Sequence, residues 1–144
     1  MNYYKEIKQE LINNEITKKV KDYSKNKSDL NTYYNVGKLL SEAGKHYGEG
    51  IIKEYSKKLT SELSRGYSER NLRSMRQFYK VSEKWQTLSA RLSWSHYCEV
   101  LWFEENKFIY YVKVCCNQNL SVRELREKIK NKEYERLDDK KKKN

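Results

Sequence analysis

Basic and amide side chains recur along residues 69–80 at a spacing that gathers them on one side of a helix. At 100° per residue they share one arc of about 120°, and they are Arg70, Arg73, Arg76, Gln77 and Lys80. The opposite arc is apolar and holds Leu72, Met75, Phe78 and Tyr79. A guanidinium can grip a phosphate or the edge of a guanine, and a glutamine amide can pair with adenine. The arc therefore carries side chains suited to DNA.

Positive charge is concentrated around this arc. The chain of 144 residues has 31 Lys and Arg against 20 Asp and Glu, a balance of 31 − 20 = +11. Residues 51–80 hold eight bases and three acids, which is 8 − 3 = +5 of that total, whereas residues 31–50 and 81–118 are each neutral. The predicted DNA-binding residues are Lys53, Lys57, Lys58, Arg65, Ser68, Arg70, Asn71, Arg73, Arg76, Gln77 and Lys80. A charged outer face is also what any solvated surface helix carries, and this alternative stays open.

The elements that position these residues are predicted to be helices throughout. The chain has no Pro and only five Gly, and apolar residues recur at helical spacing from end to end. A first helix has the stripe Ile7, Leu11, Ile16 and Val20, and a second begins at Leu30 after the polar stretch 24–29. Gly44, Gly48 and Gly50 crowd together and predict a helix end and a turn. The fold class expected is all-α, a compact multi-helix domain.

The basic arc belongs to the second half of a predicted helix-turn-helix unit. A third helix carries its apolar side chains at Ile51, Ile52, Tyr55, Leu59 and Leu63. A short link over 64–68 follows, and Ser68 is placed to cap a helix from Glu69 to about Val81. Two helices joined by a short turn containing Gly match the helix-turn-helix outline, and the first residues of the second helix are those that enter the groove.

Three further helices are predicted in the rest of the chain. Ser93 caps one from Trp94 to about Phe103, residues 107–116 form a core helix, and Ser121 with Glu124 makes a capping box. We expect one domain over residues 1–137 and a basic, disordered tail over 138–144.

No cofactor or metal is expected. The only histidines are His46 and His96, and the three cysteines, Cys98, Cys115 and Cys116, suit neither a disulfide framework nor a metal site. No apolar run approaches the ~18 residues of a membrane span, and the N-terminus lacks the apolar core of a signal peptide. We expect a cytoplasmic protein that does not bind membranes.

Four blocks of the sequence are distinctive in their residues and their order. They are the block from Gly50-Ile51-Ile52 through Gly66-Tyr67-Ser68-Glu69-Arg70-Asn71-Leu72-Arg73-Ser74-Met75-Arg76-Gln77-Phe78-Tyr79, then Leu92-Ser93-Trp94-Ser95-His96-Tyr97, Ser121-Val122-Arg123-Glu124-Leu125 and Tyr134-Glu135-Arg136-Leu137. Over about residues 30–137 the chain resembles the N-terminal domain of the YhcG-type proteins. The resemblance implies an all-helical, helix-turn-helix-like, DNA-binding domain that normally precedes a PD-(D/E)XK nuclease domain.

The resemblance does not carry catalysis to this chain, because the nuclease half would begin after Leu137. Such a nuclease needs an Asp and a Glu-x-Lys on neighbouring strands to hold a divalent ion and activate water. Glu6-Ile7-Lys8 and Glu105-Asn106-Lys107 fit the short pattern, but neither lies on a predicted strand. We therefore expect no enzyme and no catalytic residues.

A protein-interaction module is the alternative function. In that case the chain regulates or inhibits a nuclease or a defence system carried by a mobile element, or pairs with a full-length relative. The candidate partner interface is Trp94, His96, Tyr97, Trp102, Tyr110 and Tyr111, unless these aromatic residues form the core. A homodimer is a further possible assembly, since helix-turn-helix proteins commonly bind two-fold sites as dimers.

Overall fold

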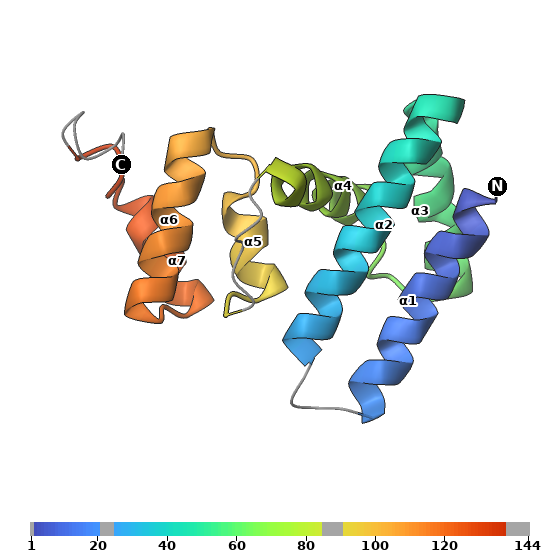
Figure 1. Ribbon diagram of the computed structural model, residues 1–144, viewed down its shortest axis with the longest axis horizontal. Helices are drawn as coiled ribbons and strands as arrows, with labels where there is room; N and C mark the ends of the chain where they lie inside the picture. Colours follow the sequence, from blue (N-terminus) through green and yellow to red (C-terminus); the bar gives the residue numbers. More distant parts are fainter. Residues whose placement is uncertain (1, 21–24, 85–90, 138–144) are drawn as a thin grey trace. The chain divides into compact units, whose positions relative to one another are not determined.

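A computed structural model of the chain describes residues 2–20, 25–84 and 91–137, although it does not place the side chains of residues 18–20 and 25–28 (Figure 1). The described residues form seven α-helices and no strand, which confirms the predicted all-α class. The helices are α1 Tyr3–Val20, α2 Lys25–Tyr47, α3 Gly50–Glu62, α4 Glu69–Lys84, α5 Trp94–Val100, α6 Glu105–Gln118 and α7 Val122–Lys130.

The chain divides into two compact units, Met1–Leu88 with α1 to α4 and Ser89–Asn144 with α5 to α7. The single domain expected over residues 1–137 stays a prediction. The tail expected over 138–144 lies outside the described residues.

In the first unit, α2 packs against both α1 and α4, and α3 packs against α2 and α4. α1 and α2 run side by side in Figure 1. The buried side of α1 carries Ile7, Leu11 and Asn14, whose amide donates to Asp29 Oδ1 at 2.9 Å. Ile16, which was expected in the apolar stripe, is 56% exposed. Its position five residues after Leu11 is about 140° around the helix from it, so the prediction for Ile16 was wrong.

The second helix is longer at both ends than the sequence predicts. α2 begins at Lys25 instead of Leu30, because the polar stretch there contains no Pro or Gly to prevent a helix. It continues through Gly44, and its last residue is Tyr47. The next residue, Gly48, has a φ of +87°, the left-handed conformation that favours glycine after a helix. The turn between α2 and α3 is therefore set by Gly48 and not by the first glycine of the cluster.

The contact between α2 and α4 depends on Gly37. A Cβ built on Gly37 would collide with the backbone carbonyl of Met75 and lie 2.8 Å from Tyr79 Cβ. Only a residue without a side chain permits the two helix backbones to approach this closely. Leu72, Met75 and Phe78 of the predicted apolar arc of α4 are buried.

In the second unit the predicted caps form. Ser93 Oγ accepts the N–H of His96 at 3.3 Å, and Ser121 Oγ accepts that of Glu124 at 3.1 Å while Ser121 N–H donates to the Glu124 carboxylate. The predicted core helix over 107–116 is α6. α5 ends at Val100 rather than Phe103, because Phe103 N–H bonds to the Val100 carbonyl in a tighter turn.

We expect Gly37→Ala to lower the free energy of unfolding by about 1–3 kcal/mol, because the added methyl group must push α2 and α4 apart. Gly44→Ala is the matched control on the same helix. Its Cβ would have ordinary contacts of 3.9 Å, and replacing a helical glycine should stabilise by about 0.5–1 kcal/mol. Urea unfolding followed by circular dichroism measures both. Equal stability of the two variants would contradict the close approach.

Candidate nucleic-acid interface

The N-terminus of α4 is fixed by the link that precedes it. Ser68 Oγ accepts the N–H of Asn71 at 3.1 Å, which confirms the predicted cap. The Asn71 amide donates to the Gly66 carbonyl at 2.6 Å, and the buried Tyr67 carbonyl accepts the Ser56 hydroxyl of α3 at 2.8 Å. The side chains of Ser68 and Asn71, which were predicted to contact DNA, therefore make hydrogen bonds within the turn. Arg65, on the same link, is exposed.

Four cations of α4 are exposed, namely Arg70, Arg73, Lys80 and, at the last residue of the helix, Lys84. We call the first three, which belong to the predicted arc, the basic face. Arg73 makes a long ion pair of 3.5 Å with Glu69, one turn earlier on the same helix. Arg70 and Lys80 have no ion pair with any residue that the structure describes. Gln77 is half-buried rather than fully outward.

Arg76 occupies a different position. Only 15% of its side chain is exposed, and its Nη1 donates to both carboxylate oxygens of Glu49, at 2.8 and 3.0 Å. The hydrogen bond and charge of Arg76 lower the pKa of Glu49, and the charges of Lys80 and Arg73 lower it further. The expectation of a free Arg76 on the outer arc was thus wrong, because the residue lies at the edge of that arc, where the α2–α3 turn reaches it.

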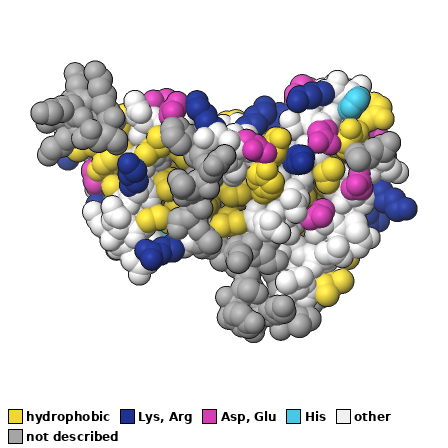
Figure 2. All heavy atoms as spheres, viewed as in Figure 1, with side chains coloured by type: hydrophobic (Ala, Val, Ile, Leu, Met, Phe, Trp, Pro, Cys, Tyr) yellow, Lys and Arg dark blue, Asp and Glu magenta, His cyan; other side chains and the backbone are white. Residues whose placement is uncertain are grey.

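Glu49 is the residue of this site that sequence reasoning missed. It precedes α3 at the N-cap position, but its side chain makes no capping hydrogen bond and is directed to Arg76 instead. Nothing in the local spacing identifies this pair, because its members are 27 residues apart. Figure 2 shows Lys and Arg side chains interspersed with Asp and Glu on the visible side of the first unit, so local pairing of charges is not confined to α4.

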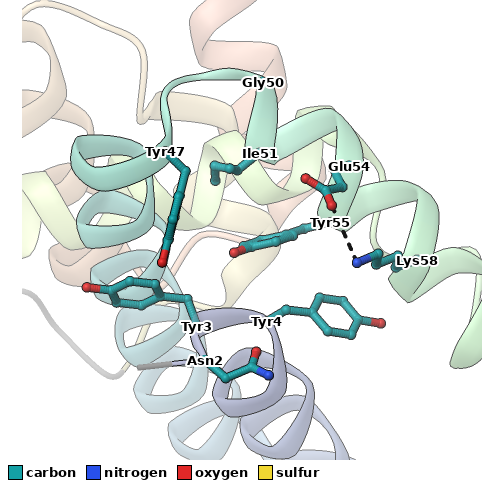
Figure 3. Close-up of a pocket in the computed structure, with 9 residues that line it drawn as sticks. All are labelled: Asn2, Tyr3, Tyr4, Tyr47, Gly50, Ile51, Glu54, Tyr55 and Lys58. Atoms are coloured by element: carbon teal, nitrogen blue, oxygen red, sulfur yellow. Dashed lines mark ion pairs between the residues drawn. The ribbon is translucent and has the colours of Figure 1, made fainter.

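The three lysines of α3 do not all lie on one side of the helix. Lys53 and Lys57 are exposed and, four residues apart, lie on one side of the helix. Lys58 pairs with Glu54 at 3.4 Å, and its Nζ lies 5.2 Å from the centre of the Tyr4 ring of α1 (Figure 3). Lys58 is therefore turned toward α1 and is separated from Lys53 and Lys57.

The residues that were considered for a partner interface differ in their burial within the second unit. Tyr97 and Tyr111 are fully buried, so they belong to the core and cannot form a surface patch. Tyr110 is half-buried and donates to the Glu133 carboxylate at 2.6 Å, and Trp94 is also half-buried. Trp102 is 60% exposed.

His96 ties two turns of the second unit together. Its Nε2 lies 2.8 Å from the Leu120 carbonyl, which can only accept, so Nε2 carries the proton. Nδ1 then accepts the backbone N–H of Ser93 at 3.1 Å and completes the cap of α5. His96 therefore has a structural role, because both of its ring nitrogens are hydrogen-bonded to backbone groups of the second unit.

The two Glu-x-Lys triplets lie on helices. Lys8 pairs with Glu62 at 2.7 Å, and Lys107 pairs with Glu135 at the same distance. Within the described residues, no group of three or more His, Cys, Asp or Glu side chains could hold a metal ion. None of the helices described in the structure is long and apolar enough to span a membrane.

These features define an all-helical domain in which a capped helix carries the basic face. The chain belongs to the DUF1016 N-terminal domain family, the YhcG-type N-terminal domain, whose model matches residues 6–136. The match starts earlier than the resemblance over about 30–137 indicates, and it includes α1. A search of curated proteins found no match, and a search of solved structures found none.

We expect His96→Ala to destabilise the second unit by about 1–3 kcal/mol, because it leaves the Ser93 N–H and the Leu120 carbonyl without their partner. Amide hydrogen exchange should show faster exchange along α5, with α4 unchanged. Ser95→Ala, at the exposed neighbouring position, is the control and should leave exchange as it is. Unchanged protection of α5 in the His96 variant would exclude the bridging role.

Proposed function

We propose that this chain is a non-catalytic DNA-binding module that uses a helix-turn-helix-like unit made of α3, the link and α4. The observation that carries the proposal is the basic face. Arg70, Arg73 and Lys80 project from a helix whose opposite side is anchored in the core, and the latter two lie at positions seven residues apart. Two turns of helix separate them, about 10 Å along the axis, a length that fits within the major groove.

The positions of the other cations support contacts with the phosphate backbone. Lys53 and Lys57 are exposed on α3, and Arg65 is exposed on the link. In helix-turn-helix proteins the first helix crosses the backbone while the second enters the groove. We therefore assign these three residues to phosphates and the basic face to the groove. Lys58, which is turned toward α1, is left out of the interface.

Glu49 restrains this surface electrostatically. Its carboxylate takes the guanidinium of Arg76, where a phosphate oxygen would otherwise bind, and its charge acts on Lys80 and Arg73 as well. Only the Glu49 side of this pair is open to solvent, because its side chain is 71% exposed and that of Arg76 is 15% exposed. A polyanion that approaches from the Glu49 side would compete with this carboxylate for Arg76.

Two further features support the non-catalytic part of the proposal. The lysines of both Glu-x-Lys triplets are engaged in ion pairs, and both triplets lie on helices, not on the paired strands that such nuclease chemistry needs. The competing role as a protein-interaction module rests on Trp102, the exposed member of the aromatic segment. A single exposed side chain offers a smaller basis for a function than the clustered charge of the first unit.

We expect the triple variant Arg70→Ala, Arg73→Ala, Lys80→Ala to lose binding to random duplex DNA in an electrophoretic or anisotropy titration. The slope of log K against log salt concentration should also become shallower, because the three removed cations no longer displace counterions from the DNA. Helical circular dichroism should be retained, because all three side chains are exposed.

The control for this experiment is Lys5→Ala, Lys38→Ala, Lys113→Ala, which removes the same charge from exposed positions outside the basic face. It should bind DNA nearly as wild type does. Equal losses in the two triple variants would mean that net charge, and not the α4 surface, governs binding. Wild-type affinity in the first variant would refute the assignment.

We expect Glu49→Gln to strengthen DNA binding about two- to fivefold, because it removes the carboxylate that competes with phosphate for Arg76. Glu54→Gln removes an equal charge on the α1 side of α3 and should change affinity less. A weaker Glu49→Gln complex would show that the ion pair positions Arg76 for binding instead of restraining it.

A further inference from the structure

A pocket lined by tyrosines lies in the first unit, away from the basic face. It has a volume of about 700 Å³ and is formed by the start of α1, the end of α2 and one side of α3 (Figure 3). Its aromatic residues are Tyr3, Tyr4, Tyr47 and Tyr55. The chain contains 13 Tyr, two of them adjacent at positions 3 and 4, but only the fold brings rings from three helices to one place.

The rings surround one space. Tyr3 and Tyr47 meet edge-on with centroids 6.2 Å apart, and Tyr4 and Tyr55 are 5.4 Å apart. In Figure 3 the rings of Tyr47 and Tyr55 stand on two sides of this space, Tyr3 lies below it and Ile51 lies above it. Tyr47 is 65% exposed and forms the rim, whereas Tyr3 and Tyr55 are almost buried and fixed by their surroundings.

The electrostatics of the pocket favour a cation. Tyrosine ring faces are electron-rich and attract ammonium groups, and Lys58 Nζ already lies 5.2 Å from the centre of the Tyr4 ring. Burial raises the pKa of Tyr3, and the negative charges of Glu42 and Glu6 raise it further; burial and then Glu54 do the same for Tyr55. The phenols therefore stay protonated and neutral, with carboxylates close to them. Among the lining residues, an anion would meet ring faces and the Glu54 carboxylate, and the only cation there, Lys58, is already paired with Glu54.

We propose that this pocket binds an alkylammonium group, either of a free amine or at the end of a lysine side chain. The ammonium would lie among the rings of Tyr3, Tyr47 and Tyr55, with Glu54 at the edge as its counter-ion. The alkyl chain of the ligand would extend out of the pocket beside Tyr47, the exposed residue at its rim. Lys58 is the built-in competitor, because it pairs with Glu54 at 3.4 Å and repels a second cation. This site is independent of DNA binding by α4.

The test is calorimetric titration of the full chain with choline, with its uncharged isostere in which carbon replaces the nitrogen, and with Nα-acetyl-lysine methyl amide. Choline and the lysine derivative should bind and the isostere should not, since the attraction depends on charge. Stronger binding of choline would assign the site to free quaternary amines, and stronger binding of the lysine derivative would assign it to a side chain. Failure of both cations to bind, or equal binding of the isostere, would overturn the proposal.

Variants of the residues that line the pocket test whether the ligand is a cation or an anion. Tyr47→Ala should weaken binding about tenfold while Tyr47→Phe retains it, because the ring supplies the attraction. Tyr47 is largely exposed, so both variants should fold. Glu54→Gln should weaken binding, and Lys58→Met should strengthen it several-fold by removing the competing cation. The opposite effects, or binding of adenosine monophosphate in place of choline, would identify an anion site and refute the proposal.

Discussion

The close approach of α2 and α4 at Gly37 is the constraint on which the first unit depends. Because Gly37 has no side chain, the backbone of α4 at Met75 lies directly against α2, and the apolar residues of α4 are committed to that interface. The rotation of α4 about its axis is then fixed, and Arg70, Arg73 and Lys80 face outward. A Cβ built on Gly44, two turns further along α2, would lie 3.9 Å from both Arg76 Nη1 and a carboxylate oxygen of Glu49, which are ordinary contacts. The close approach is therefore confined to Gly37.

The basic surface that results is partly neutralised by the protein itself. Glu49 and Glu69 are paired with Arg76 and Arg73, at distances from 2.8 to 3.5 Å. The pair of Arg73 with Glu69 joins two exposed side chains and is therefore weak and screened by salt, whereas the Arg76 side chain of the other pair is only 15% exposed.

Tyrosine has a structural role in both units that follows from the polar composition of the chain. Hydroxyl groups donate to carboxylates between helices or between a helix and a turn, as in the pairs Tyr4 with Glu62, Tyr34 with Glu83, Tyr110 with Glu133 and Tyr134 with Glu104. The bond to Glu83 is the main reason that the pKa of Tyr34 rises to about 12. In a chain with 37% hydrophobic residues, a ring can cover the core while its hydroxyl reaches a surface carboxylate. The tyrosine-lined pocket is the place where several such rings leave a space between them.

Local interactions explain what the sequence determined by itself. The all-α class, the apolar arc of α4 and the caps at Ser68, Ser93 and Ser121 each depend on residues no more than a few positions apart, so their spacing identifies them. The tertiary structure decided the rest. The pairing of Arg76 with Glu49, the turn of Lys58 toward Tyr4, the burial of Tyr97 and Tyr111 and the gathering of tyrosines from three helices all join distant segments. A helical repeat indicates which residues share a side of one helix, but only the packing of the helices determines which neighbour that side contacts. The physical reason is that a charged side chain can face solvent, pair with a carboxylate or lie over an aromatic ring, and the sequence pattern is the same in all three cases.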